Sequence, residues 1–432
     1  MQVLGLWVLA LSLPSLGFVQ RLFEVVIPII FPHFPFPTQM AIGGMAGYLL
    51  AVFGIVFYAH RKQTLFYQYV ENKHALLGFI LSLSSLLLLF MWLYPLATAG
   101  SFGGGSDRDE ALNIAVTELL RGHYPYYAKT YVPGYPHQAG LDGNPISPLP
   151  GELLLALPFV VVFGNGAYQT FFWLGAWFVL LGDYLQDWRK ALWVWLSCLM
   201  FAPVCLNEII SGGDLLANSL WVIIFSYGVL RSRSRLQIIF AILLGIGLAS
   251  RPHFLLLLPL LFAGLWQQHG KSQATQLAAW IALSFLAISL PFYLYDPQGF
   301  SPLHVYNKLA RFNDLLPWAS VLIPALTGLC ALWLCWLPKN TDISSLFLRM
   351  AIVQSLPIVG AVALHSWQQG RVNFMEFGWY GLSAGLFAVL GLSKQITVTF
   401  DCVPNPLKGL NIKGSNKTGL ASPFEKGGLR GI

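Results

Sequence analysis

Residues 106–151 read SDRDEALNIAVTELLRGHYPYYAKTYVPGYPHQAGLDGNPISPLPG and form the longest polar interval of the chain. The remainder is largely apolar: of 432 residues, 56% are hydrophobic and only 10% are charged, and the mean hydropathy is +0.63. Because so few charges cannot cover a water-facing surface, an ordinary soluble domain is excluded. Ionisable groups are costly near a bilayer, so a charged interval between apolar runs is where chemistry on a membrane substrate is expected.

The apolar runs predict an all-α, polytopic membrane protein. They approach the roughly 20 residues that a helix needs to cross a bilayer, and their number predicts about twelve transmembrane helices. The runs are continuous and do not alternate, which favours helices over a barrel. The expected organisation is N-terminal transmembrane helices at 1–97, an extracytoplasmic catalytic loop with a surface helix at 98–151, a transmembrane helical core at 152–394 and a disordered cytoplasmic tail at 395–432.

Basic residues predict the orientation of the chain in the membrane. Those that mark cytoplasmic loops under the positive-inside rule are Arg61, Lys62, Lys73, Arg189, Lys190, Arg231, Arg233 and Arg235. This assignment treats the run 151–163, which is too short to cross comfortably, as an interfacial or re-entrant helix, and 168–185 as a crossing. The polar interval 106–151 then faces outward, and we expect a multi-pass protein of a bacterial plasma membrane.

Neither the net charge nor the D-x-D sequence requires a further partner. The formal net charge of +7 comes from dispersed Lys and Arg, which the positive-inside bias explains, so no nucleic-acid partner is expected. Asp107 and Asp109 form a D-x-D pair, which holds a divalent cation in soluble nucleotide-sugar transferases. The chain has no room for the nucleotide-binding domain of those enzymes, so no cofactor is expected, although two carboxylates and water could hold Mg²⁺ or Mn²⁺.

Three acids open the polar interval and are its candidate catalytic residues: Asp107, Asp109 and Glu110. The stretch 110–122 has apolar residues at helical spacing and ends at a glycine, which predicts a short amphipathic helix at the membrane surface. The acids could cap this helix, because Ser106 and Asp109 resemble a capping box. An acid at a helix start above a bilayer is also well placed as a general base for an acceptor hydroxyl. The two interpretations are compatible.

The stretch DEALNIAVTELLRG (109–122) resembles the first outer loop of the GT-C superfamily of integral-membrane glycosyltransferases, in which an acidic motif begins a surface helix. The sequence GHYPYY (122–127) resembles the Leu-x-Gly-x-x-Pro-Tyr pattern of the mannosyltransferase-like branch. Residues 211–230 and 245–264 resemble paired helices of that branch. The chain departs from the pattern in its additional spans before the acidic loop and in Asn113, near where a tyrosine is expected.

The resemblance implies transfer of a sugar from a polyprenyl-phosphate-linked donor, which is itself a membrane lipid, to a lipid or glycan acceptor on the extracytoplasmic side. Asp109, with Asp107 and Glu110 beside it, would take the acceptor proton. Arg251 would bind the leaving phosphate, with His253 beside it. The other candidate substrate-binding residues are Tyr126, Asn144, Asp214, Lys308, Arg311 and Arg371. Each cation could instead be an interfacial side chain bound to ordinary headgroups, and the tyrosines an aromatic belt.

Two other functions use a similar set of residues. A transporter or flippase for a lipid-linked or amphipathic solute is expected to place its ionisable residues near the midplane, in interrupted helices. In this sequence they lie at span ends and in outer loops, which favours the enzyme. A polymerase or ligase of surface polysaccharide shares the donor chemistry but usually has its largest outer loop later in the chain.

Overall fold

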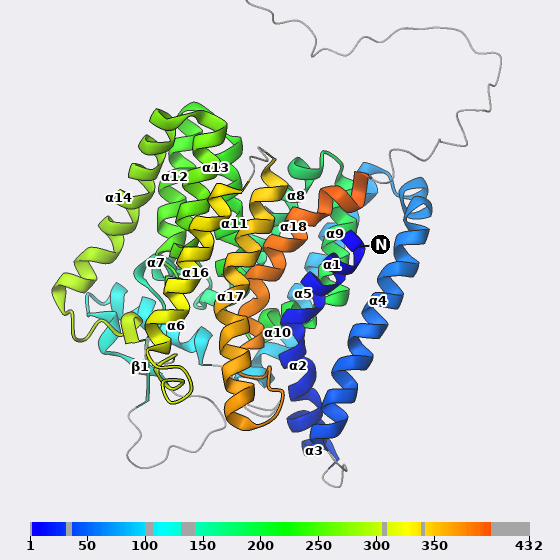
Figure 1. The fold of residues 1–432 in the computed structure, drawn as a ribbon, viewed down its shortest axis with the longest axis horizontal. Helices are drawn as coiled ribbons and strands as arrows, with labels where there is room; N and C mark the ends of the chain where they lie inside the picture. The colour runs from blue at the N-terminus through cyan, green and yellow to red at the C-terminus, as the bar shows by residue number, and fades with distance from the viewer. Residues whose placement is uncertain are drawn as a thin grey trace, which may run out of the picture.

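The computed structural model describes residues 2–31, 37–99, 107–130, 143–304, 309–337 and 342–398, which are mostly helical (Figure 1). Within these residues, six helical stretches are long and apolar enough to cross a membrane, or up to eight if each of two bent helix pairs is one span. The only strands in this part of the chain are the two-residue pair β1 (Lys129–Thr130) and β2 (Asn144–Pro145). The prediction of an all-α membrane protein is therefore confirmed.

The described residues form the following helical elements, in chain order. The first part of the chain forms α1 (Gln2–Ser12), η1 (Leu13–Ser15), α2 (Leu16–Arg21), η2 (Leu22–Val26), α3 (Ile27–Ile30), α4 (Pro37–Tyr69), α5 (Asn72–Thr98), α6 (Arg108–Leu120) and η3 (Pro125–Tyr127). The middle part forms α7 (Pro150–Phe163), η4 (Gly166–Tyr168), α8 (Gln169–Leu185), α9 (Trp188–Phe201), α10 (Pro203–Ile210), α11 (Leu215–Arg231) and α12 (Ser234–Leu248). The last part forms η5 (Pro252–Leu257), α13 (Leu258–His269), α14 (Lys271–Tyr295), η6 (Ser301–His304), α16 (Ala319–Trp336), α17 (Ile343–Gln369), η7 (Gly378–Gly381) and α18 (Leu382–Val398).

Two of these elements correspond to named predictions. The helix predicted for residues 110–122 forms as α6, which begins two residues earlier, at Arg108. Helix α18 continues to Val398, past residue 395, where a tail was expected to begin, because Ile396 still packs into the core at 4% exposure. The remainder of that tail, residues 399–432, lies outside the described residues.

The helices run back and forth between two ends of the bundle, which differ in character (Figure 1). At the end that carries α6 and β1, polar contacts join α5 to α6, α6 to α10 and to the turn before α11, and η3 to α14. At the opposite end, hydrogen bonds join α4 to α9, α8 to α11 and α12 to α13. We call the first end the acidic end, because the carboxylates Asp107, Asp109 and Asp214 all lie there.

Two helix pairs are sharply bent, and local residues explain both bends. α7 and η4–α8 meet at 107°, where Gly164 adopts a left-handed conformation (φ 72°) and Asn165 caps the new helix with its side chain. α9 and α10 meet at 80°, where Pro203 begins α10. The first bend separates α7 from α8, in agreement with the predicted division between residues 151–163 and 168–185. Both bends bring chain segments to the acidic end.

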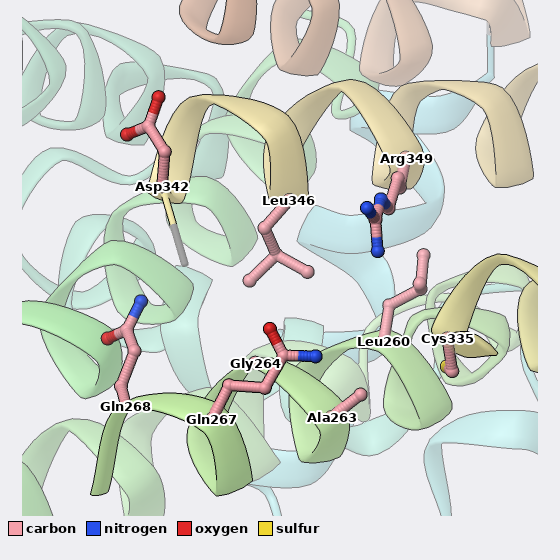
Figure 2. A pocket seen from close by; sticks show the side chains of 9 residues that line it. All are labelled: Leu260, Ala263, Gly264, Gln267, Gln268, Cys335, Asp342, Leu346 and Arg349. Atoms are coloured by element: carbon pink, nitrogen blue, oxygen red, sulfur yellow. The ribbon is translucent and has the colours of Figure 1, made fainter. Parts of the chain in front are cut away.

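A small, open hollow with a volume of about 10 Å³ lies between α13, α16 and α17, toward the other end of the bundle (Figure 2). Its lining residues are Leu260, Ala263, Gly264, Gln267, Gln268, Cys335, Asp342, Leu346 and Arg349. The Arg349 guanidinium also donates to the Leu334 carbonyl over 3.0 Å, so it secures α17 to α16. The acidic end therefore does not share this hollow.

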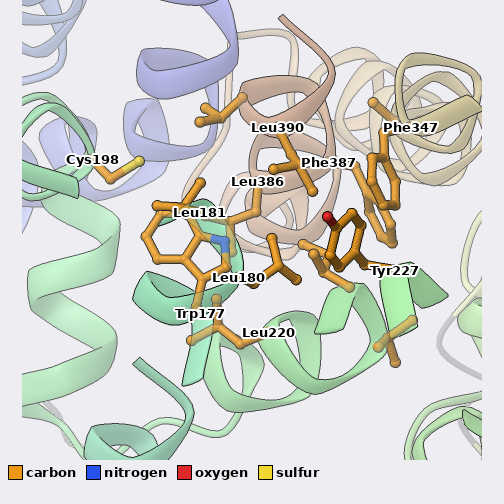
Figure 3. Packing of buried hydrophobic residues seen from close by; sticks show 14 of the residues in the cluster. Trp177, Leu180, Leu181, Cys198, Leu220, Tyr227, Phe347, Leu386, Phe387 and Leu390 are labelled. Atoms are coloured by element: carbon orange, nitrogen blue, oxygen red, sulfur yellow. The ribbon is translucent and has the colours of Figure 1, made fainter. Parts of the chain in front are cut away.

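A single apolar core holds most of the helices together (Figure 3). Trp177 and Leu181 of α8, Leu220 of α11 and Phe387 of α18 are at most 2% exposed and meet in its centre. Close packing of this kind matters in a bilayer, because lipid tails are as apolar as the side chains and the hydrophobic effect no longer drives helices together. The core therefore fixes where α11 and its polar N-terminal turn lie.

Backbone contacts join α7 to the end of α12 at the acidic end. The Gly151 amide donates to the Ala249 carbonyl over 2.7 Å, and the Leu149 amide donates to the Ser250 carbonyl over 3.0 Å. A Cβ atom on Gly151 would lie 2.1 Å from the Ile246 carbonyl oxygen. Only glycine therefore allows the two backbones to approach this closely.

We expect Gly151→Ala to destabilise the protein by about 1–3 kcal/mol, because the added methyl group meets backbone atoms that cannot turn away. Thermal unfolding of the purified protein in detergent measures this as a lower melting temperature. Gly47→Ala in α4 is the matched control, since nothing lies within 4 Å of a Cβ there. Equal melting temperatures for the two variants would contradict this account of the α7–α12 contact.

Candidate functional site

Asp109 lies in the first turn of α6 and is only 4% exposed. Its Oδ2 accepts a hydrogen bond of 2.6 Å from the Tyr94 hydroxyl, near the end of α5. Burial raises the pKa of Asp109 to about 6, although the Tyr94 hydrogen bond and the Arg108 charge act in the opposite direction. A carboxylate with a pKa near neutrality can accept a proton and release it again, which suits a general base.

The glycine turn between α10 and α11 closes over Asp109. Gly212 has a φ of 67°, and a Cβ there would lie 2.7 Å from the Tyr94 ring and 3.3 Å from the Asp109 Cβ. The left-handed conformation and the lack of a side chain both favour glycine at this position. The turn thereby brings Asp214, two residues later, beside the start of α6.

Asp107 ties the polar interval together rather than capping α6. It is the N-cap residue, but its side chain makes no capping hydrogen bond. Instead its Oδ2 accepts hydrogen bonds of 2.8 Å from Thr130 and from Asn144, which lie on the paired strands β1 and β2. Asn144, which was predicted to bind substrate, thus donates its amide hydrogen to Asp107. Ser106, the other residue of the expected capping box, lies outside the described residues.

Glu110 is the third acid at the start of α6, after Asp107 and Asp109, and is half-buried. Burial and the neighbouring Asp107 raise its pKa. Within the described residues its carboxylate has no hydrogen bond or ion pair. Glu110 therefore differs from Asp109, whose carboxylate is held by Tyr94.

A buried chain of alternating charges runs beneath α6, and we call it the ion-pair ladder. Arg108 contacts Glu208 at 2.5 Å and Asp214 at 3.3 Å. The other oxygen of Asp214 contacts Arg251, whose Nε lies 3.1 Å from Glu152. The three carboxylates are fully buried, and the Arg108 and Arg251 side chains are 18% and 12% exposed. The order is thus Glu208, Arg108, Asp214, Arg251 and Glu152.

The ladder joins residues that are far apart in the sequence. Its members come from α6, α7, α10, the α10–α11 turn and the residue before η5. Two further hydrogen bonds hold its carboxylates: Glu208 accepts from the Leu215 amide at 3.1 Å, and Glu152 accepts from Asn218 at 3.2 Å. Burial of carboxylates requires this kind of pairing, because an unpaired charge in the interior is strongly unfavourable.

Sequence reasoning found part of the ladder. Arg251 and Asp214 were predicted as substrate-binding residues, and the structure brings both to the acidic end. Arg108 and Glu152 were missed. The sequence contained a signal for both. Arg108 stands between two aspartates, and Glu152 is an acid at the start of an apolar helix, where a charge needs a partner.

Arg251 makes all of its contacts at the acidic end. Besides Glu152 and Asp214, it donates a hydrogen bond of 3.2 Å to the Ser147 hydroxyl. His253, two residues on in η5, packs its ring against Phe254, and its carbonyl accepts from Gln354 over 3.1 Å. In this arrangement the Arg251 guanidinium faces carboxylates of the protein itself.

The tyrosines of the polar interval attach it to α14. Tyr126 is buried, and its hydroxyl donates to the Pro148 carbonyl over 3.1 Å. Burial raises the pKa of Tyr126 well above its usual range, so the hydroxyl keeps its proton. Tyr124 donates to the Phe292 carbonyl at 2.9 Å, and Tyr127 donates to Asp296 at 3.0 Å. The Tyr126 ring, predicted to bind substrate, thus lies in a small apolar core under α6.

The remaining predicted cations belong to other clusters. Arg311 pairs with Glu376 and lies over the ring of Phe377 at 4.7 Å. Arg371 pairs with Glu24 at 3.0 Å. Within the described residues neither arginine is paired with a member of the ladder, and Lys308 lies outside those residues.

Comparison of the chain with models of known families, with curated proteins and with solved structures finds no match. Over the part of the chain that the structure describes, no group of three or more His, Cys, Asp or Glu side chains is arranged to hold a metal ion. The geometry of the acidic end is therefore the observation on which a functional assignment has to rest.

The ladder predicts that Arg108, which begins α6, contributes much more to the stability of the protein than Arg121, which follows the end of the same helix. Arg108→Met leaves Glu208 and Asp214 buried with one cation fewer, so we expect a loss of about 3–5 kcal/mol in stability. Arg121→Met breaks only the exposed pair with Glu118 and should cost about 1 kcal/mol or less. Thermal unfolding in detergent measures both changes, and a wild-type melting temperature for Arg108→Met would contradict the ladder.

Proposed function

We propose that the chain is a membrane glycosyltransferase of the GT-C type. It moves a sugar from a polyprenyl-phosphate-linked donor to a lipid or glycan acceptor on the extracytoplasmic face of a bacterial plasma membrane. The observation that carries the proposal is Asp109, a buried carboxyl group with a pKa raised to about 6, held beside a group of guanidinium ions at one end of an apolar helical bundle.

In the proposed reaction, Asp109 acts as the general base. The acceptor hydroxyl loses its proton to Oδ1 of Asp109 as its own oxygen bonds to the anomeric carbon of the sugar. The bond between that carbon and the phosphate oxygen breaks, and the lipid phosphate leaves with the electron pair. Tyr94 donates to Oδ2, so the proposed reaction assigns the acceptor proton to the other oxygen.

The leaving phosphate needs positive charge, and the ladder supplies two guanidinium groups at the acidic end. Arg108 is the sequence neighbour of Asp109, and Arg251 is one carboxylate further along the ladder. Arg251 already faces Glu152 and Asp214, so a phosphate that binds it replaces one of these carboxylates. Donor binding in this proposal is therefore an exchange of ion-pair partners.

The proposed membrane arrangement has about twelve crossings. The six long helices and two bent pairs are joined in this count by the shorter apolar helices α11 and α12, and by α13 and α18. Of the basic residues predicted to mark cytoplasmic loops, Lys73 lies at the start of α5, Arg189 at the start of α9 and Arg231 at the end of α11, which are the helix ends away from the acidic end. The positive-inside rule then favours an acidic end that faces outward.

A transporter or flippase for a lipid-linked solute is the second candidate, and the bent pairs favour it. Transporters build binding sites from interrupted helices near the midplane. Here the buried carboxylates of the ladder lie in the first turn of α7, near the end of the short α10 and in the turn before α11, and not in the middle of a long helix. Transport assays in proteoliposomes discriminate the two, because a transporter moves a labelled lipid-linked sugar across the bilayer without breaking the sugar–phosphate bond.

We expect Asp109→Asn to reduce sugar transfer about 100-fold or more, because the amide cannot accept the proton. The assay uses membranes or purified protein with a labelled polyprenyl-phosphate sugar and follows release of the lipid phosphate. Glu118→Gln, in the same helix but outside the acidic group, should retain activity. If Glu110→Gln lost activity and Asp109→Asn kept it, the half-buried neighbour would be the base instead.

The raised pKa of Asp109 predicts the pH dependence of transfer. The base works only when ionised, so kcat/KM should fall as the pH decreases through about 6. Initial rates measured across this range at acceptor concentrations well below KM give the midpoint of kcat/KM. A midpoint near 4, the ordinary range of a solvated aspartate, would contradict a buried base.

A further inference from the structure

A continuous chain of side-chain hydrogen bonds leads from the start of α8 to Asp109. The Asn165 amide donates to the Tyr94 hydroxyl at 2.7 Å, and that hydroxyl donates to Asp109 at 2.6 Å. Behind Asn165, its Oδ1 accepts from the Asn113 amide at 3.1 Å and from the Ala167 backbone amide at 2.9 Å. The chain therefore links α5, α6 and η4.

Backbone amides fix the direction of every bond in this chain. A backbone N–H can only donate, so the atom of Asn165 that faces the Ala167 amide is its carbonyl oxygen. Likewise the Gly166 amide donates to Asn113 at 2.7 Å, which leaves the Asn113 nitrogen to face Asn165. The Asn165 nitrogen must then point at Tyr94. Because this donor occupies the Tyr94 oxygen, the hydroxyl hydrogen is directed at Asp109.

The bend between α7 and α8 supplies this arrangement. Asn165 follows the left-handed Gly164, has an extended backbone (φ −154°), and begins the turn that leads into α8. A continuous helix through this position would leave the amides of residues 166 and 167 bonded within the helix. The break frees these amides, and they anchor the two asparagines.

We propose that Tyr94 and Asn165 are positioning residues for Asp109, which they hold as an ionised carboxylate through a hydrogen bond to its Oδ2. This inference rests on the proposed role of Asp109 as the base. The Tyr94 hydrogen bond stabilises the charged form of Asp109 against burial. Asn165 fixes the Tyr94 hydroxyl so that it donates to Asp109 and to no other group.

Other charged groups near Asp109 come from three elements. Arg108, its neighbour in α6, favours the ionised form, while Asp107 and Glu110 on the same helix carry the same charge as Asp109. On the α10–α11 side the charged groups are Glu208 and Asp214, and both are paired with Arg108. From α5, Tyr94 is the titratable contact. The direct hydrogen bond distinguishes Tyr94 from the rest.

The test is a titration of the Asp109 carboxyl group in the full chain in detergent or nanodiscs. Infrared or NMR spectra of protein labelled with ¹³C at the aspartate carboxyl groups follow its protonation, and Asp109→Asn identifies its signal. We expect Tyr94→Phe to raise the titration midpoint by about 1–2 pH units, because a hydrogen bond to the charged form is lost. Asn165→Ala should shift the midpoint in the same direction by less, and it serves as the test if Tyr94→Phe does not fold.

Tyr124→Phe is the matched control, because it removes a hydroxyl that donates to backbone carbonyl groups in the same region. The control should leave the Asp109 midpoint unchanged. The acidic limb of the pH profile of sugar transfer should move with the midpoint in Tyr94→Phe, which a purely structural role would not produce. A midpoint that stays constant or falls in both Tyr94→Phe and Asn165→Ala overturns the inference.

The titration and the activity assay separate this inference from the proposed function. If Asp109→Asn keeps full transfer activity, the proposed function fails even when Tyr94→Phe shifts the titration midpoint. If Asp109→Asn is inactive and Tyr94→Phe leaves the midpoint unchanged, Asp109 keeps its role and the positioning role of Tyr94 is wrong.

Discussion

Pairing of buried charges is the constraint on which the acidic end depends. Glu152, Glu208 and Asp214 are fully buried, and the cost of removing a carboxylate from water is recovered only when a cation and hydrogen bonds meet it. Arg108 and Arg251 satisfy all three carboxylates only if α6, α7, the α10–α11 turn and the residues before η5 converge. The apolar core brings these segments near one another, and the ladder specifies how their ends meet.

Much of the architecture was predictable from the sequence because its signals are local. Hydropathy over about 20 residues locates the long helices, and the helical spacing after Asp109 locates α6. The short run 151–163 correctly indicated a break before α8. These features depend on residues close in sequence, so they can be recognised without knowing the tertiary contacts.

The site was less predictable, because its contacts join distant residues. Arg108 and Glu208 are separated by 100 positions, and nothing local relates them. Tyr94 lies within an apolar run and shows its role only when α5 ends beside Asp109. The prediction for Tyr126 was a substrate-binding ring or part of an aromatic belt. In the structure η3 directs this ring into a small apolar core. Side-chain direction in irregular segments is set by packing and not by spacing.

The ladder holds three carboxylates against two guanidinium groups, and this imbalance has an electrostatic consequence. An anion that binds Arg251 increases the excess of negative charge. The carboxylate that it displaces is then buried without its cation and tends to take up a proton. In the proposed reaction, anion binding at the ladder is thereby coupled to protonation, whereas Asp109 has to be ionised. The two requirements oppose each other, so the proposed reaction would be fastest in an intermediate window of proton concentration.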